Sequence, residues 1–248
     1  MFTEQAFYNA GELWAIGSDA NNTPAPFGTL QDVALDFSFT EKELRGQNLF
    51  AEETAQAEAK ITGKAKFGRI DLALFNAQYF NGTLATGTLK VSYNEAAAIP
   101  AATPFTVVVA NAATMTDDLG VVYASNKHER LEKVAGVPAT GQYSVNVATG
   151  TYTFAAADEG LGVLISYRYS VPASGHTLTV TNQLAGASPY FSIILRNSYQ
   201  GVEAGMKLYR CMSSKLSLAT KLGDFMIPEF DFSALADSAG NVFEFWGL

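Results

Sequence analysis

Two carboxylates near the C-terminus, Glu229 and Asp231 in DFMIPEFDFSALADSAG, have a spacing that acid–base chemistry could use. On a strand they project from one face, roughly 6 to 7 Å apart, whereas glycosidases pair carboxylates at about 5 or 9 Å. The alternative is a strand with one wet face, while Phe230 and Phe232 pin the other face to the core. A sugar hydrolase would usually carry tryptophan or tyrosine near its acids, whereas both tryptophans of this chain lie at its ends. We therefore favour the strand with one wet face and one core face.

The other reactive side chains form no recognisable catalytic or metal-binding pattern. His128 and His176 lie far apart in polar turns, which does not favour a metal pair or a catalytic triad. Asp117 and Asp118, followed by Gly120, lack the regularly spaced oxygens of a calcium loop and are predicted to form a turn. We therefore expect no catalytic residue, no cofactor and no bound metal.

The composition favours a protein that buries surface against other chains. Hydrophobic residues make up 48% of the 248 residues and charged residues only 16%, below the roughly 25% of ordinary soluble chains. The net charge of −8 repels a phosphate backbone. Recognition of nucleic acid through charge is therefore disfavoured.

Cysteine use and hydropathy bear on the compartment. A single cysteine, Cys211, excludes an intramolecular disulfide and fits a reducing compartment, where it is expected to be a small core residue. The opening MFTEQAFYNAGELW lacks the basic and apolar regions of a signal peptide. No run approaches the roughly 18 apolar residues of a membrane span. We expect cytoplasmic synthesis and no membrane insertion.

Most of the chain alternates with period two between turn residues, which predicts an all-β protein. In VALDFSF, the apolar side chains fall on one face and Asp32, Asp36 and Ser38 on the other. In KITGKAKF, Lys64 and Lys66 lie opposite an apolar face in the same way. Roughly a dozen such segments are enough for a β-sandwich or barrel.

One segment, DLALFNAQYFNG, predicts a flanking α-helix. Leu72, Phe75 and Tyr79 recur at helical spacing, Asp71 can cap the start, and Asn81-Gly82 can end the helix.

Two segments suggest how the chain is divided. Residues 45–59, RGQNLFAEETAQAEA, are predicted to be a long loop or hairpin tip, and EAAAIPAATP at 95–104 is predicted to be a linker. The β pattern after the linker predicts a small inserted β subdomain at 103–175. The flanking residues 1–98 and 176–248 would then form one discontinuous β core.

The order of these motifs resembles a known family. Its members open with a pattern similar to GTLQDVALDFSFTEKELRGQNLFAEETAQAEAKITGKAKFGRIDLALFNAQYF and close with one similar to CMSSKLSLATKLGDFMIPEFDFSALADSAGNVFEFW. Between them, GQYSVNVATGTYTFAAADEGLGVLISYRYS resembles a β segment found inside such proteins. The family is that of bacteriophage tail tube, or major tail, proteins. The likeness covers most of residues 28 to 246.

The resemblance implies a structural virion protein of the phage tail, made in the host cytoplasm, and not an enzyme. It implies a tail-tube-like β-sandwich or barrel that forms hexameric rings, stacked into a tube through which the genome leaves. The subunit itself is then the main partner. Tape measure, tail terminator and baseplate or tail-tip proteins are further expected partners, and DNA passes transiently without specific binding.

Within this resemblance, two groups of residues are candidates for function. Carboxylates on strand faces would line the lumen and repel phosphate, or else face outer solvent or a neighbouring subunit; they are Asp32, Asp36, Glu229 and Asp231. The 45–59 segment would become ordered against the next ring. Its apolar anchors and acidic contacts would be Leu49, Phe50, Glu52 and Glu53, with the acids seeking Lys64, Lys66 or Arg69.

Two other functions stay open from the sequence. A capsid decoration or tail-tip protein would form trimers or monomers and use the inserted region for binding. A β-fold carbohydrate hydrolase would depend on Glu229 or Asp231.

Overall fold

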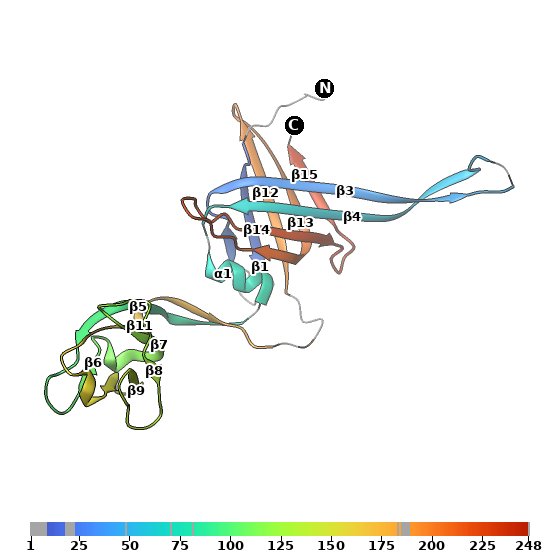
Figure 1. Ribbon diagram of the computed structural model, residues 1–248. Helices are drawn as coiled ribbons and strands as arrows, with labels where there is room; N and C mark the ends of the chain where they lie inside the picture. The colour runs from blue at the N-terminus through green and yellow to red at the C-terminus, as the bar shows by residue number, and fades with distance from the viewer. Residues whose placement is uncertain are drawn as a thin grey trace. The chain divides into compact units, whose positions relative to one another are not determined.

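A computed structural model describes residues 9–17, 23–47, 49–69, 71–80, 82–182, 184 and 189–247. Most of these residues lie in strands, which form sheets of eight, four and three strands, and one short α-helix is present among them (Figure 1). The predicted all-β class with one helix is confirmed. The predicted barrel is not seen in the described strands, because β2 and β3 end the largest sheet without pairing to each other.

The chain divides into two compact units. The first unit contains residues 1–84 and 178–248, and the second contains residues 85–177. The insertion predicted at 103–175 falls inside the second unit, whose boundary lies earlier. The reason is that β5 (Thr83–Ala98) pairs with β11 (Gly162–Thr179), so the first residues of the predicted 95–104 linker are strand.

The eight-stranded sheet belongs to the first unit. Its order is β2-β1-β12-β13-β14-β4-β3, and β15 also pairs with β13. The strands are β1 (Glu12–Gly17), β2 (Pro24–Pro26), β3 (Leu30–Leu44), β4 (Glu53–Phe67), β12 (Tyr190–Tyr199), β13 (Val202–Ser217), β14 (Glu229–Leu235) and β15 (Phe243–Gly247).

The core of the first unit lies on one face of this sheet. Phe230 and Phe232 are buried, and their rings stack with centroids 5.0 Å apart. Phe230 also stacks on Phe27 at 4.9 Å and meets Phe67 edge-on. These contacts confirm that Phe230 and Phe232 hold the C-terminal strand to the core.

The predicted helix is present but changes form after one turn. Helix α1 (Leu72–Phe75) continues as the π-helical segment η1 (Asn76–Phe80). Asp71 caps the start as predicted, since its Oδ1 accepts hydrogen bonds from the backbone N–H of the residues two and three positions ahead. The Asn76 side chain bonds the N–H and C=O of Gly82, at 2.6 and 2.9 Å. Asn81 of the predicted end lies outside the described residues.

The wider π turn brings a polar side chain into the interior. Gln78 is 1% exposed, and neither its amide nitrogen nor its amide oxygen has a hydrogen-bond partner among the described residues. Leu74 and Phe75 are buried beside it, whereas the predicted Leu72 and Tyr79 are half-buried.

The second unit contains two small sheets, ordered β6-β10-β9-β8 and β5-β11-β7. Its remaining elements are β6 (Thr106–Val108), η2 (Ala112–Thr114), β7 (Met115–Tyr123), β8 (Glu132–Lys133), β9 (Gln142–Asn146), β10 (Thr151–Phe154) and η3 (Ala156–Asp158). Tyrosines dominate the core, with Tyr143, Tyr152 and Tyr167 all buried. In the described part of the chain, no helix has the length and apolar character needed to cross a membrane.

Candidate functional site

The four predicted lumen carboxylates lie on the same face of the eight-stranded sheet. Asp32 of β3 pairs with Lys66 of β4, which in turn pairs with Glu229 of β14. Side chains directly opposite in neighbouring strands share a face. The Lys66 Nζ lies 3.0 Å from the Glu229 carboxylate.

The next rows of the face repeat this alternation of charge. Asp231 pairs with Lys64 on one side and with Lys215 of β13 on the other. Asp36 lies opposite Thr62 of β4. Because the lysine-bearing strand β4 lies between β3 and β14, the face has mixed charge instead of a uniform acidic surface. We call this surface, made by Asp32, Asp36, Lys64, Lys66, Lys215, Glu229 and Asp231, the charged face.

The ion pair in the charged face affects what its carboxylates can do chemically. The hydrogen bond and the charge of Lys66 hold the pKa of Glu229 below its usual range. The same contact raises the pKa of Lys66. A glycosidase general acid needs a raised pKa. Glu229 is thus a poor general acid, which leaves Asp231 as the other carboxylate that the carbohydrate-hydrolase interpretation names.

The second predicted group lies at the tip of a long hairpin made by β3 and β4. Strand β14 pairs with β4 only between Ile61 and Lys66, whereas β3 and β4 pair with each other out to Leu44 and Glu53. The outer part is therefore a two-stranded ribbon, which Figure 1 shows running past the rest of the sheet. The segment predicted at 45–59 as a long loop or hairpin tip is thus a hairpin tip, but a shorter one than predicted, because β4 already begins at Glu53.

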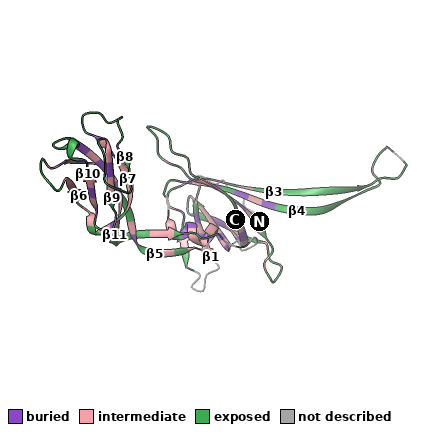
Figure 2. Ribbon diagram, turned by 60° about the horizontal axis from the view of Figure 1, so that its bottom comes forward, coloured by how far each residue is buried: buried purple, intermediate pink, exposed green. Residues whose placement is uncertain are grey.

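The outer hairpin, residues 38–60, is exposed along its described length except at the half-buried Ala51 (Figure 2). Leu49 and Phe50 at the tip are 83% and 80% exposed, and Phe39 and Leu44 are exposed along the ribbon. Glu52 donates its backbone N–H to the Leu44 carbonyl, closing the turn at 2.9 Å. Large apolar side chains on an isolated hairpin lie where a partner would bury them.

The acidic residues of the tip have no basic partner within the described chain. No ion pair joins Glu52 or Glu53 to a basic side chain there, and Lys66, one of the predicted partners, is held by Glu229. Lys64 lies opposite Asp231 in the sheet. The predicted contacts of the tip with the next ring therefore stay a prediction.

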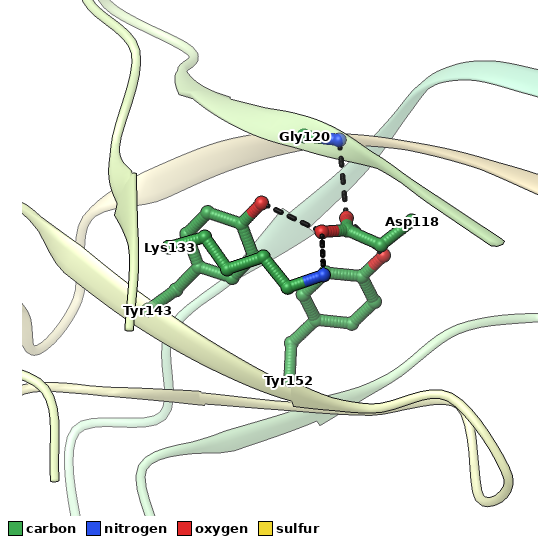
Figure 3. Close-up of polar contacts among 5 residues, drawn as sticks. All are labelled: Asp118, Gly120, Lys133, Tyr143 and Tyr152. Atoms are coloured by element: carbon green, nitrogen blue, oxygen red, sulfur yellow. Dashed lines mark hydrogen bonds and ion pairs between the residues drawn. The ribbon is translucent and has the colours of Figure 1, made fainter. Parts of the chain in front are cut away.

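A polar cluster that the sequence did not reveal lies in the second unit, around Asp118. We predicted a turn at Asp117 and Asp118, but both lie in strand β7. The Asp118 side chain is only 3% exposed and accepts hydrogen bonds from Tyr143 and Tyr152, at 2.8 and 2.9 Å (Figure 3). The same carboxylate also accepts the Gly120 backbone N–H at 3.0 Å and forms an ion pair with Lys133 Nζ at 2.9 Å.

The Asp118 cluster is a structural centre. Two carboxylate oxygens that already receive four donors have no free lone pairs directed at a ligand. The only signal in the sequence was Gly120, whose positive φ of 106° lets the backbone N–H turn back to Asp118.

The other reactive residues also lack the surroundings of a catalytic site. Cys211 is buried, and burial raises the pKa of its thiol to about 12. His128 and His176 are exposed. Within the described ranges, no three His, Cys, Asp or Glu side chains gather closely enough to hold a metal ion.

Comparison with known proteins adds no family assignment. No protein family model matches the chain, and no curated protein matches it significantly.

Proposed function

We propose that this protein is a bacteriophage tail tube subunit, a structural virion protein whose rings stack around a lumen for genome passage. The proposal combines the co-linear motifs of the sequence with the surfaces of the first unit. Six subunits per ring follow from the resemblance.

The observation that carries the proposal is the outer hairpin. A two-stranded ribbon alone is marginally stable in water, yet this one exposes Phe39, Leu44, Leu49 and Phe50. Burying one such side chain against a partner contributes roughly 1.5 to 3 kcal/mol. A subunit that inserts this ribbon against the next ring would bury these side chains and pair the strand edges. The ribbon therefore suits repeated contact between copies.

The charged face supports a role in the lumen or between subunits. Its lysines alternate with carboxylates, so it presents no strip of unpaired positive charge that would hold a phosphate backbone. The chain as a whole has a net charge of −8. A channel built from such subunits would let DNA slide without binding it.

Electron microscopy with a hairpin variant tests the proposal. The purified chain, concentrated and viewed in negative stain, is expected to form rings or hollow tubes. The double variant Leu49→Ser/Phe50→Ser should stay folded by circular dichroism but form few or no tubes, because the ring-to-ring contact loses its apolar anchors. Val137→Ser is the matched control, since Val137 is 96% exposed but lies in the second unit.

Three other outcomes would contradict the proposed tail tube contact or function. Full-length tubes from the double variant would exclude the tip as a ring contact. Monomers or trimers of the unmodified chain at every concentration would favour a decoration or tail-tip protein. Glycan cleavage that disappears in Glu229→Gln would favour the hydrolase.

A further inference from the structure

A groove of about 340 Å³ lies on the second unit, on the sheet β5-β11-β7. Val122 of β7 and Leu164 of β11 are paired in register and give it apolar walls. The loop after β7 adds Lys127 and Arg130, and β5 adds Tyr93 and Asn94. The groove thus combines apolar, aromatic and basic side chains, and none of the functions above uses it.

The charges of the groove are all positive. Its lining contains Lys127 and Arg130 but no aspartate or glutamate. Elsewhere in this unit, Lys133 and Arg168 are neutralised by Asp118 and Asp117. No such pair forms for Lys127 or Arg130 among the described residues. Two uncompensated cations on an acidic chain favour an anionic ligand.

Backbone contacts with β7 hold Arg130 in place at the groove. Arg130 forms a β-bridge with Val122, and the following residue, Leu131, donates its N–H to the Val121 carbonyl at 3.0 Å. Tyr123 N–H bonds the Glu129 carbonyl at 3.2 Å. The loop is therefore tied to the edge of β7, which reduces the entropy lost on binding.

An amide in the groove is also available to a ligand. Ser166 Oγ accepts the Asn94 backbone N–H at 3.1 Å and lies 3.5 Å from Asn94 Oδ1. No described residue accepts a hydrogen bond from the Asn94 side-chain nitrogen. Asn94 has a φ of 57°, in the left-handed region that asparagine tolerates. An NH₂ donor without a partner among the described residues thus lines the same groove as the two cations.

The exposed ring of Tyr93 favours a sugar as the part of the anionic ligand that lies against it. Tyr93 is 79% exposed, although it is a large ring on a sheet face. Exposed tyrosine offers an apolar ring face and a polar tip, which suits the alternating C–H and O–H groups of a sugar. A polyanion such as DNA is disfavoured by the net charge of −8.

We propose that this groove binds an acidic saccharide, with its carboxylate on Arg130 and Lys127 and a sugar ring on Tyr93. This role is independent of tube formation. In the phage setting it would add a contact with a glycan surface to a structural subunit.

Calorimetric titration of the full chain tests the site, with trigalacturonic acid as the acidic probe and maltotriose as the neutral one. We expect the acidic trimer to bind and the neutral one to bind at least about tenfold more weakly, since charge-assisted hydrogen bonds contribute roughly 1.5 to 3 kcal/mol. Arg130→Gln and Tyr93→Ala should each lower the affinity for the acid by about tenfold or more. Lys90→Gln, an exposed cation on β5 outside the groove, should not change it.

Several results would overturn the site. They are no heat of binding with the acidic trimer, equal binding of both sugars, or equal loss of affinity in Lys90→Gln. Inorganic phosphate that competes as well as the acidic trimer would show a simple anion site without a sugar subsite. Tighter binding of a single-stranded oligothymidine would assign the groove to nucleic acid instead.

Discussion

Replacing Asp118 with asparagine is expected to destabilise the second unit while leaving the first unit unchanged. The carboxylate has both oxygens occupied: Oδ1 receives Gly120 N–H and the Tyr152 hydroxyl, and Oδ2 receives the Tyr143 hydroxyl and Lys133. Asparagine keeps one oxygen and replaces the other with an NH₂ group that cannot accept. In either orientation of the amide, two donors lose their acceptor.

The magnitude follows from burial. A buried donor left without an acceptor costs about 1 to 3 kcal/mol. Tyr143 and Tyr152 are almost fully buried, whereas the Lys133 side chain is 53% exposed and can turn to water. If the amide nitrogen replaces Oδ2, the Tyr143 hydroxyl loses its acceptor, and if it replaces Oδ1, Gly120 N–H and Tyr152 lose theirs. The amide takes the less costly orientation, in which only the buried Tyr143 hydroxyl is left without an acceptor, so we expect a loss of about 1 to 3 kcal/mol in the stability of this unit.

Hydrogen exchange read by mass spectrometry is the suitable assay, because it follows each unit separately in the full chain. Peptides from β7, β9 and β10 should exchange roughly 5- to 150-fold faster in Asp118→Asn. Peptides from β12 and β13 should not change. The neighbouring Asp117→Asn is the control, since Asp117 pairs with Arg168 at the surface. Equal effects of the two substitutions, or none in β7, would refute the network as the centre of this unit.

Asp118 also makes the stability of the second unit depend on pH. Burial opposes ionisation of Asp118, but hydrogen bonds from Lys133, Tyr143, Gly120 and Tyr152 outweigh it and lower the pKa from 3.8. The folded state therefore binds the proton less readily than the unfolded state. The stabilisation is fully present above the unfolded pKa and is lost as the pH falls through the lowered folded pKa. Asp118→Asn should lack this acid-dependent loss.

Three further substitutions or treatments test the first unit, each by thermal denaturation or labelling. Gln78→Leu should raise stability by about 1 to 2 kcal/mol, because it removes an unpartnered buried amide; a lower melting temperature would contradict this. Gly63→Ala should lower stability by about 1 to 3 kcal/mol, because its Cβ would lie 2.1 Å from the Phe232 ring; an unchanged melting curve would show that the ring moves freely. Cys211 should react with thiol reagents only after unfolding, because burial raises its pKa to about 12; rapid labelling of native protein would refute its burial.

Local periodicity predicted the strands of the charged face and the side on which each residue lies. The alternation in β3 and β4 separates Asp32 and Lys66 from Val33 and Phe67, and the structure keeps that separation. Such patterns are local because side-chain direction depends only on the position along the strand. The cap at Asp71 was predictable for the same reason.

The neighbours of each strand were not predictable. Strand β4 lies between β3 and β14, which places Lys66 between Asp32 and Glu229. That pairing joins segments far apart in the sequence, and periodicity carries no information about it. The length of the hairpin was missed because alanine and glutamate in 53–59 have weak strand propensity, although pairing with β3 keeps them extended. The Asp118 cluster likewise depends on four strands, β7, β8, β9 and β10, that come together only in the folded unit.

The position of β4 beside β14 also affects synthesis. Phe67 ends β4 and Glu229 begins β14, and the whole second unit lies between them in the chain. At about 5 to 20 residues per second on the ribosome, the β4 edge stays unpaired for roughly 10 to 30 s. The second unit is one continuous segment, so it can fold during this interval. The β3–β4 hairpin meanwhile exposes a strand edge and phenylalanines, which makes this stage of translation the one at which chaperone binding would matter most.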